Sequence, residues 1–495
     1  MKKIICLLAA FLLAGAAIAP LPKTTASAAE ENVLNVISWE DYIGDNVIKD
    51  FEKYYQTTHN GKKITVNYST QGTNELMYSE LNINKGHYDL VCPSEYMIQK
   101  MITENMLEKL DRSDEKLKEY DNNVSTYISD LFKSTKMANG ESLYDYAACY
   151  MWGTMGFVYN PKLVDENDVK HWSVLWNEKY KNKSTIKDSV RDSFVPALGY
   201  VYEDELKGYK ADLENGKITE SEYNAKLTEV FNRVTDESIE KTGDALRTLS
   251  KLLYGFEVDS GKKEMAQGKI WINFAWSGDA VYSMDEAESD VSHTELNYVV
   301  PEEGSNIFFD GWVMPKGANV ELAQEFINYM AMSEIAIRNM DYIGYTTSIA
   351  TEEVFNFLVE EREYGYLKEN VTENGGKYYH GDSEVFPVDL GYLFLKTDDG
   401  DTLKYTIYTD TLGRQFSAQY PDYDTVTRCT IMRHFDNTEL EKLNGMWESV
   451  KAGSSPVLLI VIIIAAVAVV AAVIIVLVKK GVFTKKVKKG FKKIS

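Results

Sequence analysis

The sequence predicts an α/β fold in which two lobes are interleaved along the chain. The first observation is an alternation of apolar and amphipathic segments between residues 33 and 199. The segments with strand character are VLNVISW, KITVNYST and YDLVCP, and those with helical spacing are VIKDFEKYY, NELMYSELNINK and SEYMIQKMITENML. Strand and helix in turn are typical of a sheet with parallel strands.

The second observation is that this alternation continues beyond the middle of the chain. Strand signals return in KIWINFAW, LNYVVPEEG and IFFDGWVMP, and the helical segment VELAQEFINYMAMS follows them. This pattern favours two interleaved lobes over two sequential domains. The length agrees, because 495 residues correspond to two or three units of roughly 100 to 200 residues each.

Two long stretches stand apart from the alternation. Residues 202–251 are highly charged and have helical spacing, which predicts a helical insertion on the surface. Residues 356–430 are aromatic and acidic without a helical period, and the sequence assigns them no fold.

Both ends of the chain have the composition of targeting segments. Residues 1–30 begin with lysines, continue as an apolar run and end in small residues, which predicts a secretory signal peptide. Residues 457–478 contain no polar side chain and are long enough to cross a hydrocarbon core of about 30 Å. The tail 479–495 has eight lysines and no acid, so we expect a single-pass membrane protein with residues 31–452 outside and a cytoplasmic tail.

The part of the chain expected outside the membrane is strongly acidic. Without the lysines of the two ends, 42 basic residues stand against 75 acidic ones. Such a field disfavours nucleic acid and favours small cations, although an acidic surface also serves solubility alone. Cys92, Cys149 and Cys429 lack the spacing of a disulfide framework or a zinc motif.

Clusters of aromatic and polar residues follow four predicted strands. They are Trp39, Asp41 and Tyr42; Ser94, Glu95 and Tyr96; Trp276 and Asp279; and Phe308, Phe309 and Asp310. In open α/β sheets, ligands bind beyond the carboxyl ends of the strands. Carboxylates attract ammonium groups, and aromatic faces add about 0.5 to 2 kcal/mol while covering methylene groups, so the clusters suit a flexible aliphatic polyamine. Each residue also has a structural interpretation, in which the rings belong to the core, Asp310 is a turn residue and Ser94 caps a helix.

No catalytic or metal-binding motif is present in the sequence. The six histidines are widely separated, and the chain lacks HExxH, a nucleophile elbow, a phosphate-binding glycine loop and CxxC. We therefore expect no enzyme, no metal site and no cofactor, and an enzyme assembled from sequence-distant groups is an alternative without positive support.

Several segments, taken in order, resemble the spermidine/putrescine-binding proteins of bacterial ABC importers. They include LNVISWEDYIGDNVIKDFEK, GHYDLVCPSEYMIQKMITENMLEKLD, INFAWSGDAVY, VVPEEGSNIFFDGWVMPKGA and IGYTTS, and the matches run from about residue 33 to 452. The resemblance implies a two-lobed, periplasmic-binding-protein-like fold (type II) that closes about a hinge and presents its ligand to a permease and its ATPase. It also implies a monomer, with lobe 1 at about 33–147 and 310–355 and lobe 2 at about 148–309 and 356–452.

Carried over by motif, the resemblance implies an aromatic box with carboxylates. The rings are Trp39, Tyr42, Tyr96, Trp276, Phe308 and Tyr345, and the polar contacts are Glu40, Asp41, Ser94, Asp192 and Asp310. Three positions depart from the family pattern: Phe308 replaces a common tryptophan, Ser189 replaces a common acid, and Arg433 lies near an expected glutamine. These departures leave the choice between putrescine and spermidine open.

Two alternatives to a polyamine receptor remain at this point. One is a protein of the same fold for another small cationic or zwitterionic solute, because an inward Arg433 would oppose a polycation. The other is a membrane-tethered sensor or adhesion protein, suggested by the membrane span and by the two long stretches, which exceed the family's usual length. A membrane helix would keep a ligand carrier close to its permease, which implies a cell with a single membrane.

Overall fold

The computed structural model describes residues 32–113, 116–289, 293–394, 402–409 and 414–454. The predicted signal peptide, membrane helix and basic tail lie outside these residues. No helix within the described part of the chain combines the length and the apolarity that a membrane span requires.

The described strands form one large mixed sheet and one small antiparallel sheet. The large sheet has the order β2-β1-β3-β10-β5-β8-β6-β7. Its strands are β1 (Asn32–Ser38), β2 (Ile64–Thr70), β3 (Leu90–Val91), β5 (Ala147–Tyr159), β6 (Ser184–Lys187), β7 (Gly255–Glu257), β8 (Ile272–Trp276) and β10 (Ser305–Pro315), with β4 (Leu107–Glu108), β9 (Asn297–Val299), β11 (Thr346–Thr347) and β16 (Cys429–Thr430) paired at its sides.

The parallel arrangement expected from the sequence holds for the outer strands of the large sheet but not for its two long central strands. β1 pairs in parallel with β2 and β3, and β6 pairs in parallel with β7 and β8. The long strands β5 and β10 are antiparallel to each other, and each is antiparallel to its next neighbour, β8 and β3 respectively. Both are buried at every position, because they lie in the middle of the sheet and are covered along their whole length.

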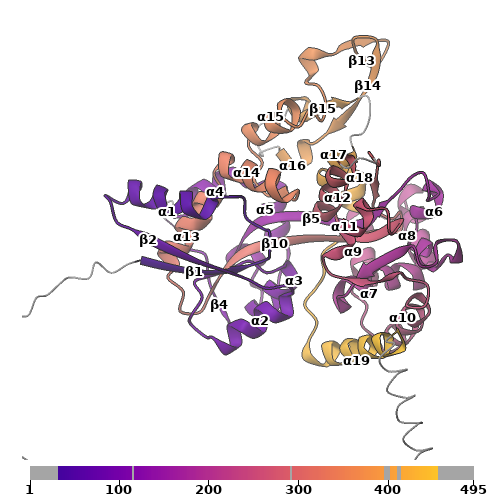
Figure 1. Ribbon diagram of the computed structural model, residues 1–495, viewed down its shortest axis with the longest axis horizontal. Helices are drawn as coiled ribbons and strands as arrows, with labels where there is room; N and C mark the ends of the chain where they lie inside the picture. The colour runs from indigo at the N-terminus through magenta and orange to yellow at the C-terminus, as the bar shows by residue number, and fades with distance from the viewer. Residues whose placement is uncertain (1–31, 114–115, 290–292, 395–401, 410–413, 455–495) are drawn as a thin grey trace, which may run out of the picture.

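The helices cover the sheet on both sides of these two strands. They are α1 (Val47–Thr58), α2 (Asn74–Ile83), α3 (Glu95–Thr103), α4 (Lys118–Asn123), α5 (Thr126–Ser134), α6 (Glu166–Val169), α7 (Val190–Val201), α8 (Glu203–Glu214), α9 (Glu220–Phe231), α10 (Asp236–Leu249), α11 (Ser260–Ala266), α12 (Ser277–Ser289), α13 (Val320–Met330), α14 (Ser333–Ile343), α15 (Glu352–Glu360), α16 (Gly391–Phe394), α17 (Arg414–Gln419), α18 (Tyr423–Thr427) and α19 (Asn437–Ser454). In Figure 1, α1 to α3 lie on one side of β5 and β10, and α7 to α10 lie on the other.

Two large hydrophobic clusters divide the core. Along β5 the first cluster ends at Trp152, and the second begins at Met155. A smaller third cluster packs α11 and α12 against Val158. The border between the two large clusters therefore crosses the two shared strands, where a hinge between lobes would lie.

The two long stretches differ in how they fold. Residues 202–251 form α8, α9 and α10, as predicted, and Leu206, Leu227 and Leu246 extend the second cluster instead of merely padding the surface. Residues 356–430 contain the small sheet of β12 (Thr372–Asn374), β13 (Lys377–His380), β14 (Ser383–Asp389) and β15 (Thr406–Thr409), part of which projects from the molecule in Figure 1. Leu390 and Ile407 of this stretch pack into the first cluster, whereas we expected residues 356–452 to belong to lobe 2. The exact limits of the lobes stay a prediction.

Candidate functional site

Asp310 is the centre of a hydrogen-bonded group that the strand order assembles. β1, β3 and β10 are neighbours in the sheet, so the turns after β1 and β3 lie beside the middle of β10. Tyr42 donates to Asp310 Oδ2 at 2.6 Å, and Ser94 donates to Asp310 Oδ1 at 2.7 Å. Asp310 is only 5% exposed. The pairing of β10 with β5 shifts between Asp310 and Gly311, and such a bulge turns a side chain out of the regular alternation.

Ser94 is fixed from its other side by α2. Asn74 Nδ2 donates to Ser94 Oγ at 3.0 Å, and the Ser94 backbone N–H donates to Asn74 Oδ1 at 2.9 Å. Neighbouring Glu95 is fully buried and accepts from the Phe309 backbone N–H at 3.0 Å. Burial raises the pKa of Glu95 to about 8, so this side chain is mostly protonated at neutral pH. The negative charge of this group therefore belongs to Asp310.

Tyr345 joins the two lobes at the edge of this group. Its ring packs against both large hydrophobic clusters, with its centroid 5.3 Å from that of Tyr42 and 6.0 Å from that of Phe308. A Cβ atom on Gly278, in the first turn of α12, would lie 1.9 Å from a ring carbon of Tyr345. Glycine at position 278 is what allows the ring to lie this close to α12.

A buried ionic network lies next to Tyr345. Lys187 Nζ at the end of β6 lies 3.0 Å from Glu257 Oε1 and 3.1 Å from Asp279 Oδ2. The same nitrogen is 4.1 Å from the ring centroid of Trp276, and Tyr345 donates to Asp279 Oδ1 at 3.2 Å. Burial lowers the pKa of Lys187, but attraction by Asp279 and Glu257 outweighs it, so the net pKa is raised and the lysine is charged. The Trp276 ring therefore already has an internal cation beside it.

Asp192 stands in the first turn of α7, which Ser189 caps by accepting from the Asp192 backbone N–H at 3.3 Å. Burial raises the pKa of Asp192 to about 6, and repulsion by Glu75 adds to this increase. Ser189, Lys187 and Arg191 lower the pKa, but burial outweighs them. Burial likewise raises the pKa of Asp310 to about 6, where the two hydroxyl donors lower it and Asp192 raises it. The negative charge of Asp192 therefore acts on Asp310 across the border between the two large clusters.

Tyr96 and Arg191 lie beside these carboxylates. Tyr96 packs against both large clusters and donates to Glu75 Oε1 at 3.2 Å. The Arg191 guanidinium lies 4.6 Å from the Tyr96 ring centroid and 3.8 Å from that of Phe435, and it donates to the Arg433 carbonyl at 2.7 Å. Arg191 is thus held in place by rings and backbone.

The remaining predicted residues come from the turn after β1. Trp39 is half-buried against the first cluster, and its backbone carbonyl accepts from Tyr68 at 3.2 Å. Glu40 and Asp41 are exposed, and Asp41 has a φ of +50°. In this turn the inward position belongs to Tyr42, so the contacts around Asp310 do not include the two acids.

Arg433 does not have the environment of an inward, ligand-facing cation. It makes a two-fold ion pair with Glu439, at 2.6 Å and 3.0 Å, and its side chain is 43% exposed. Its charge is satisfied on the surface of the second lobe. Asp188, beside Ser189, pairs with Lys451 of α19.

Five residues of this site were not singled out from the sequence: Asn74, Glu75, Lys187, Arg191 and Glu257. Asn74 and Glu75 begin the helix after β2, and Lys187 ends a strand. These residues therefore also lie near strand ends, as the predicted clusters do. Asn74, Lys187 and Arg191 were missed because an amide or a cation did not fit the expected chemistry of a cation site, whereas Glu75 fitted it and was overlooked.

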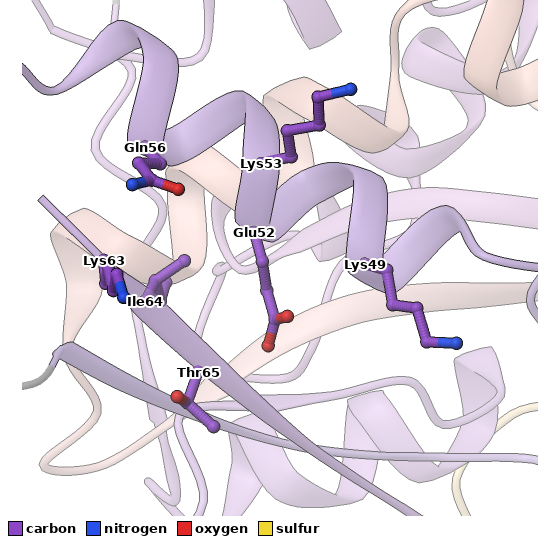
Figure 2. Close-up of a pocket in the computed structure, with 7 residues that line it drawn as sticks. All are labelled: Lys49, Glu52, Lys53, Gln56, Lys63, Ile64 and Thr65. Carbon is purple, nitrogen blue, oxygen red and sulfur yellow. The ribbon is translucent and has the colours of Figure 1, made fainter. Parts of the chain in front are cut away.

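A separate shallow pocket lies between α1 and the start of β2 (Figure 2). It is lined by Lys49, Glu52, Lys53, Gln56, Lys63, Ile64 and Thr65. This lining has no aromatic ring, and its carboxylate, Glu52, already accepts from the Val66 backbone N–H at 2.9 Å. The pocket includes none of the residues predicted to bind ligand.

Comparison with known proteins gives matches over most of the chain. A family model described as bacterial extracellular solute-binding protein matches residues 46–355. The spermidine/putrescine-binding periplasmic protein of Escherichia coli (strain K12) is 28% identical over 367 residues, covering 74% of this chain and 91% of that relative. The putrescine-binding periplasmic protein SpuD of Pseudomonas aeruginosa (strain UCBPP-PA14) is 28% identical over 333 residues, covering 65% and 79%.

The fold is also similar to that of a solved structure of a substrate-binding protein. The spermidine/putrescine ABC transporter substrate-binding protein PotD of Streptococcus pneumoniae has a TM-score of 0.56 and 26% identity, and the match covers 86% of this chain and 100% of that one.

Proposed function

Because the chain belongs to the bacterial extracellular solute-binding proteins, we propose that it binds a polyamine between its lobes and delivers it to an ABC permease. The observation that supports this proposal most strongly is the environment of Asp310. This carboxylate is buried and accepts from two uncharged hydroxyls, and no cationic partner of it is found among the described residues. A buried carboxylate without a cation is costly, and a ligand ammonium would relieve that cost. The names of the relatives, which bind spermidine or putrescine, support this ligand class.

The proposed binding set is the one predicted from the sequence, arranged around Asp310 and Asp192. Tyr42, Tyr96, Phe308 and Tyr345 would cover the carbon chain, and Trp39 and Trp276 would close the ends of the box. Glu40 and Asp41 would act from the rim, where they are exposed in the ligand-free chain. We expect binding without chemical conversion.

The local charge favours a diamine over a triamine. Leaving aside the exposed rim acids Glu40 and Asp41 and the Lys187 network, Glu75, Asp192 and Asp310 supply three negative charges and Arg191 beside them supplies one positive charge, so the surplus matches two ammonium groups. Lys187 beside Trp276 further disfavours a third ammonium there. We expect putrescine to bind at least about tenfold more tightly than spermidine in calorimetric titration, since leaving one buried ammonium unpaired costs more than about 1.4 kcal/mol. Tighter binding of spermidine would contradict this charge count.

Affinity should depend on pH with a definite sign. The pKa values of Asp192 and Asp310 are both raised to about 6, so lowering the pH from 7 to 5 protonates both in the free protein. A bound ammonium requires the ionised forms, and affinity should fall by up to about 100-fold at pH 5 if both groups contribute. Titration at pH 7, 6 and 5 measures this, and an unchanged dissociation constant would contradict it.

The second candidate is a receptor of the same fold for another small cationic or zwitterionic solute, and its zwitterionic form has less support. It depended on an inward Arg433, whereas Arg433 pairs with Glu439.

We further propose that residues 457–478 anchor the receptor in the membrane, directly after α19, as a monomer with its binding domain outside. Full-length protein should partition into the membrane fraction and require detergent for release, whereas a chain ending at residue 454 should be soluble. Soluble full-length protein in a periplasm bounded by an outer membrane would contradict the anchor.

A further inference from the structure

Three metal-ligating side chains converge outside the polyamine site, in the second lobe. His171 precedes a short 3₁₀ helix (Trp172–Trp176), Glu203 is the first residue of α8, and Glu303 lies in the turn before β10. One ligand atom from each lies within 4.8 Å of those of the other two. Glu303 is seven residues before Asp310, which corresponds to roughly 20 Å of extended chain. The group is therefore independent of the polyamine site.

The backbone that carries two of these ligands is rigidly held. The Glu302 N–H donates to the Lys170 carbonyl at 2.8 Å, and Trp172 Nε1 donates to the Gly304 carbonyl at 3.0 Å. Gly304 has a φ of +102°, and a Cβ there would lie 2.6 Å from the Arg428 carbonyl oxygen. The segments of His171 and Glu303 are thus fixed side by side before any ion binds.

Glu303 provides the second, independent observation. It is 3% exposed, and its Oε1 lies 2.5 Å from His171 Nδ1. Its other oxygen, Oε2, is buried and has no hydrogen-bond partner among the residues that the structure describes. Buried polar atoms in proteins are nearly always paired, so a cation would be stabilised next to a buried carboxylate oxygen that has no partner and lies beside another carboxylate.

We propose that His171, Glu203 and Glu303 bind one divalent transition-metal ion, with Zn²⁺ as the best match. One imidazole nitrogen and two carboxylates suit zinc, whereas Mg²⁺ and Ca²⁺ prefer oxygen ligands alone. The two carboxylates neutralise the charge of the ion. Ligand atoms of a tetrahedral zinc site lie roughly 3.3 Å apart, so small side-chain rotations close the observed spacing. His171 and Glu203 are partly exposed, which leaves a path for the ion and for a water ligand.

The ion would fasten α8 to the sheet. α8 opens the charged helical stretch 202–251, and its first residue, Glu203, would share a ligand sphere with the turn before β10. Without an ion, Glu203 pairs with Lys207, four residues along the same helix. The metal would therefore add a link between elements that are 100 residues apart in sequence.

Zinc binding to the full-length chain, produced without a histidine tag, tests the proposal. Equilibrium dialysis of detergent-solubilised protein against Zn²⁺ should give one ion per chain at about micromolar free zinc or below. Glu303→Gln and His171→Gln should each weaken this binding at least about 100-fold. Glu302→Gln is the matched control, because it makes the same change at the neighbouring residue, whose side chain pairs with Lys210 instead.

Thermal unfolding separates loss of the site from loss of the fold. Zinc should raise the Tm of the wild-type chain and of Glu302→Gln, and it should leave the Tm of Glu303→Gln unchanged, while all three bind putrescine equally without zinc. Wild-type protein that binds no zinc at tens of micromolar, or Glu303→Gln with wild-type zinc affinity, would overturn the proposal.

Discussion

Replacing Asp310 by asparagine should abolish most of the polyamine affinity. The substitution keeps the size and shape of the side chain but removes the buried charge that receives hydrogen bonds from Tyr42 and Ser94. Removing one member of a buried, hydrogen-bonded charge pair costs about 2 to 5 kcal/mol of binding free energy, which is at least about 30-fold in Kd. Calorimetric titration with putrescine measures the loss.

The matched control is Asp45→Asn, which removes one negative charge from an exposed position of the same lobe. Its affinity should stay within about twofold, because an exposed charge acts on the ligand only through screened solvent. Asp310→Asn should also remain folded, because burial raises the pKa of Asp310 and the ionised carboxylate therefore destabilises the folded state at pH 7. Folded Asp310→Asn with wild-type affinity would remove Asp310 from the binding site.

Replacing Lys187 by methionine should strongly lower the free energy of unfolding. The lysine side chain is 1% exposed, and its partners Glu257 and Asp279 are 2% and 8% exposed, so the substitution removes the cation next to Glu257 and leaves Asp279 with Lys262 at 4.0 Å. Breaking a buried ion pair in this way costs about 3 to 5 kcal/mol. Urea unfolding followed by tryptophan fluorescence or circular dichroism measures the change.

Lys181→Met is the control for this second prediction. Lys181 pairs with Glu178 on the surface, with its side chain 48% exposed, and exposed pairs contribute about 0 to 1 kcal/mol. If Lys187→Met unfolded at the same urea concentration as Lys181→Met, the network around Trp276 would contribute no more than a surface pair.

The strand and helix alternation was predictable because each element has its own local pattern. The apolar runs that became β1, β8 and β10, and the charged helical spacing that became α8 to α10, are visible in single segments. The relationship to spermidine/putrescine-binding proteins was visible for the same reason, and the family match and the relatives confirm it. What local patterns do not encode is strand direction: the antiparallel pairing of β5 with β10 depends on residues 150 positions apart.

The site was predictable in part. Tyr42, Ser94 and Asp310 were selected because each follows or lies within a strand, and the sheet order brings them into contact. Of the Lys187 network, Asp279 was singled out from the sequence. Lys187 was missed because a cation in a cation site contradicts the expected chemistry, and the two buried acids Glu257 and Asp279 are what stabilise it. His171, Glu203 and Glu303 were missed because no short spacing connects them.

The most direct test of the central claim is calorimetric titration of the chain from residue 32 to 454 with putrescine, spermidine, spermine and a panel of amino acids. We expect one site per chain, micromolar or tighter binding of putrescine, weaker binding of spermidine and no heat of binding with the amino acids. Folded protein that binds none of the polyamines would contradict it.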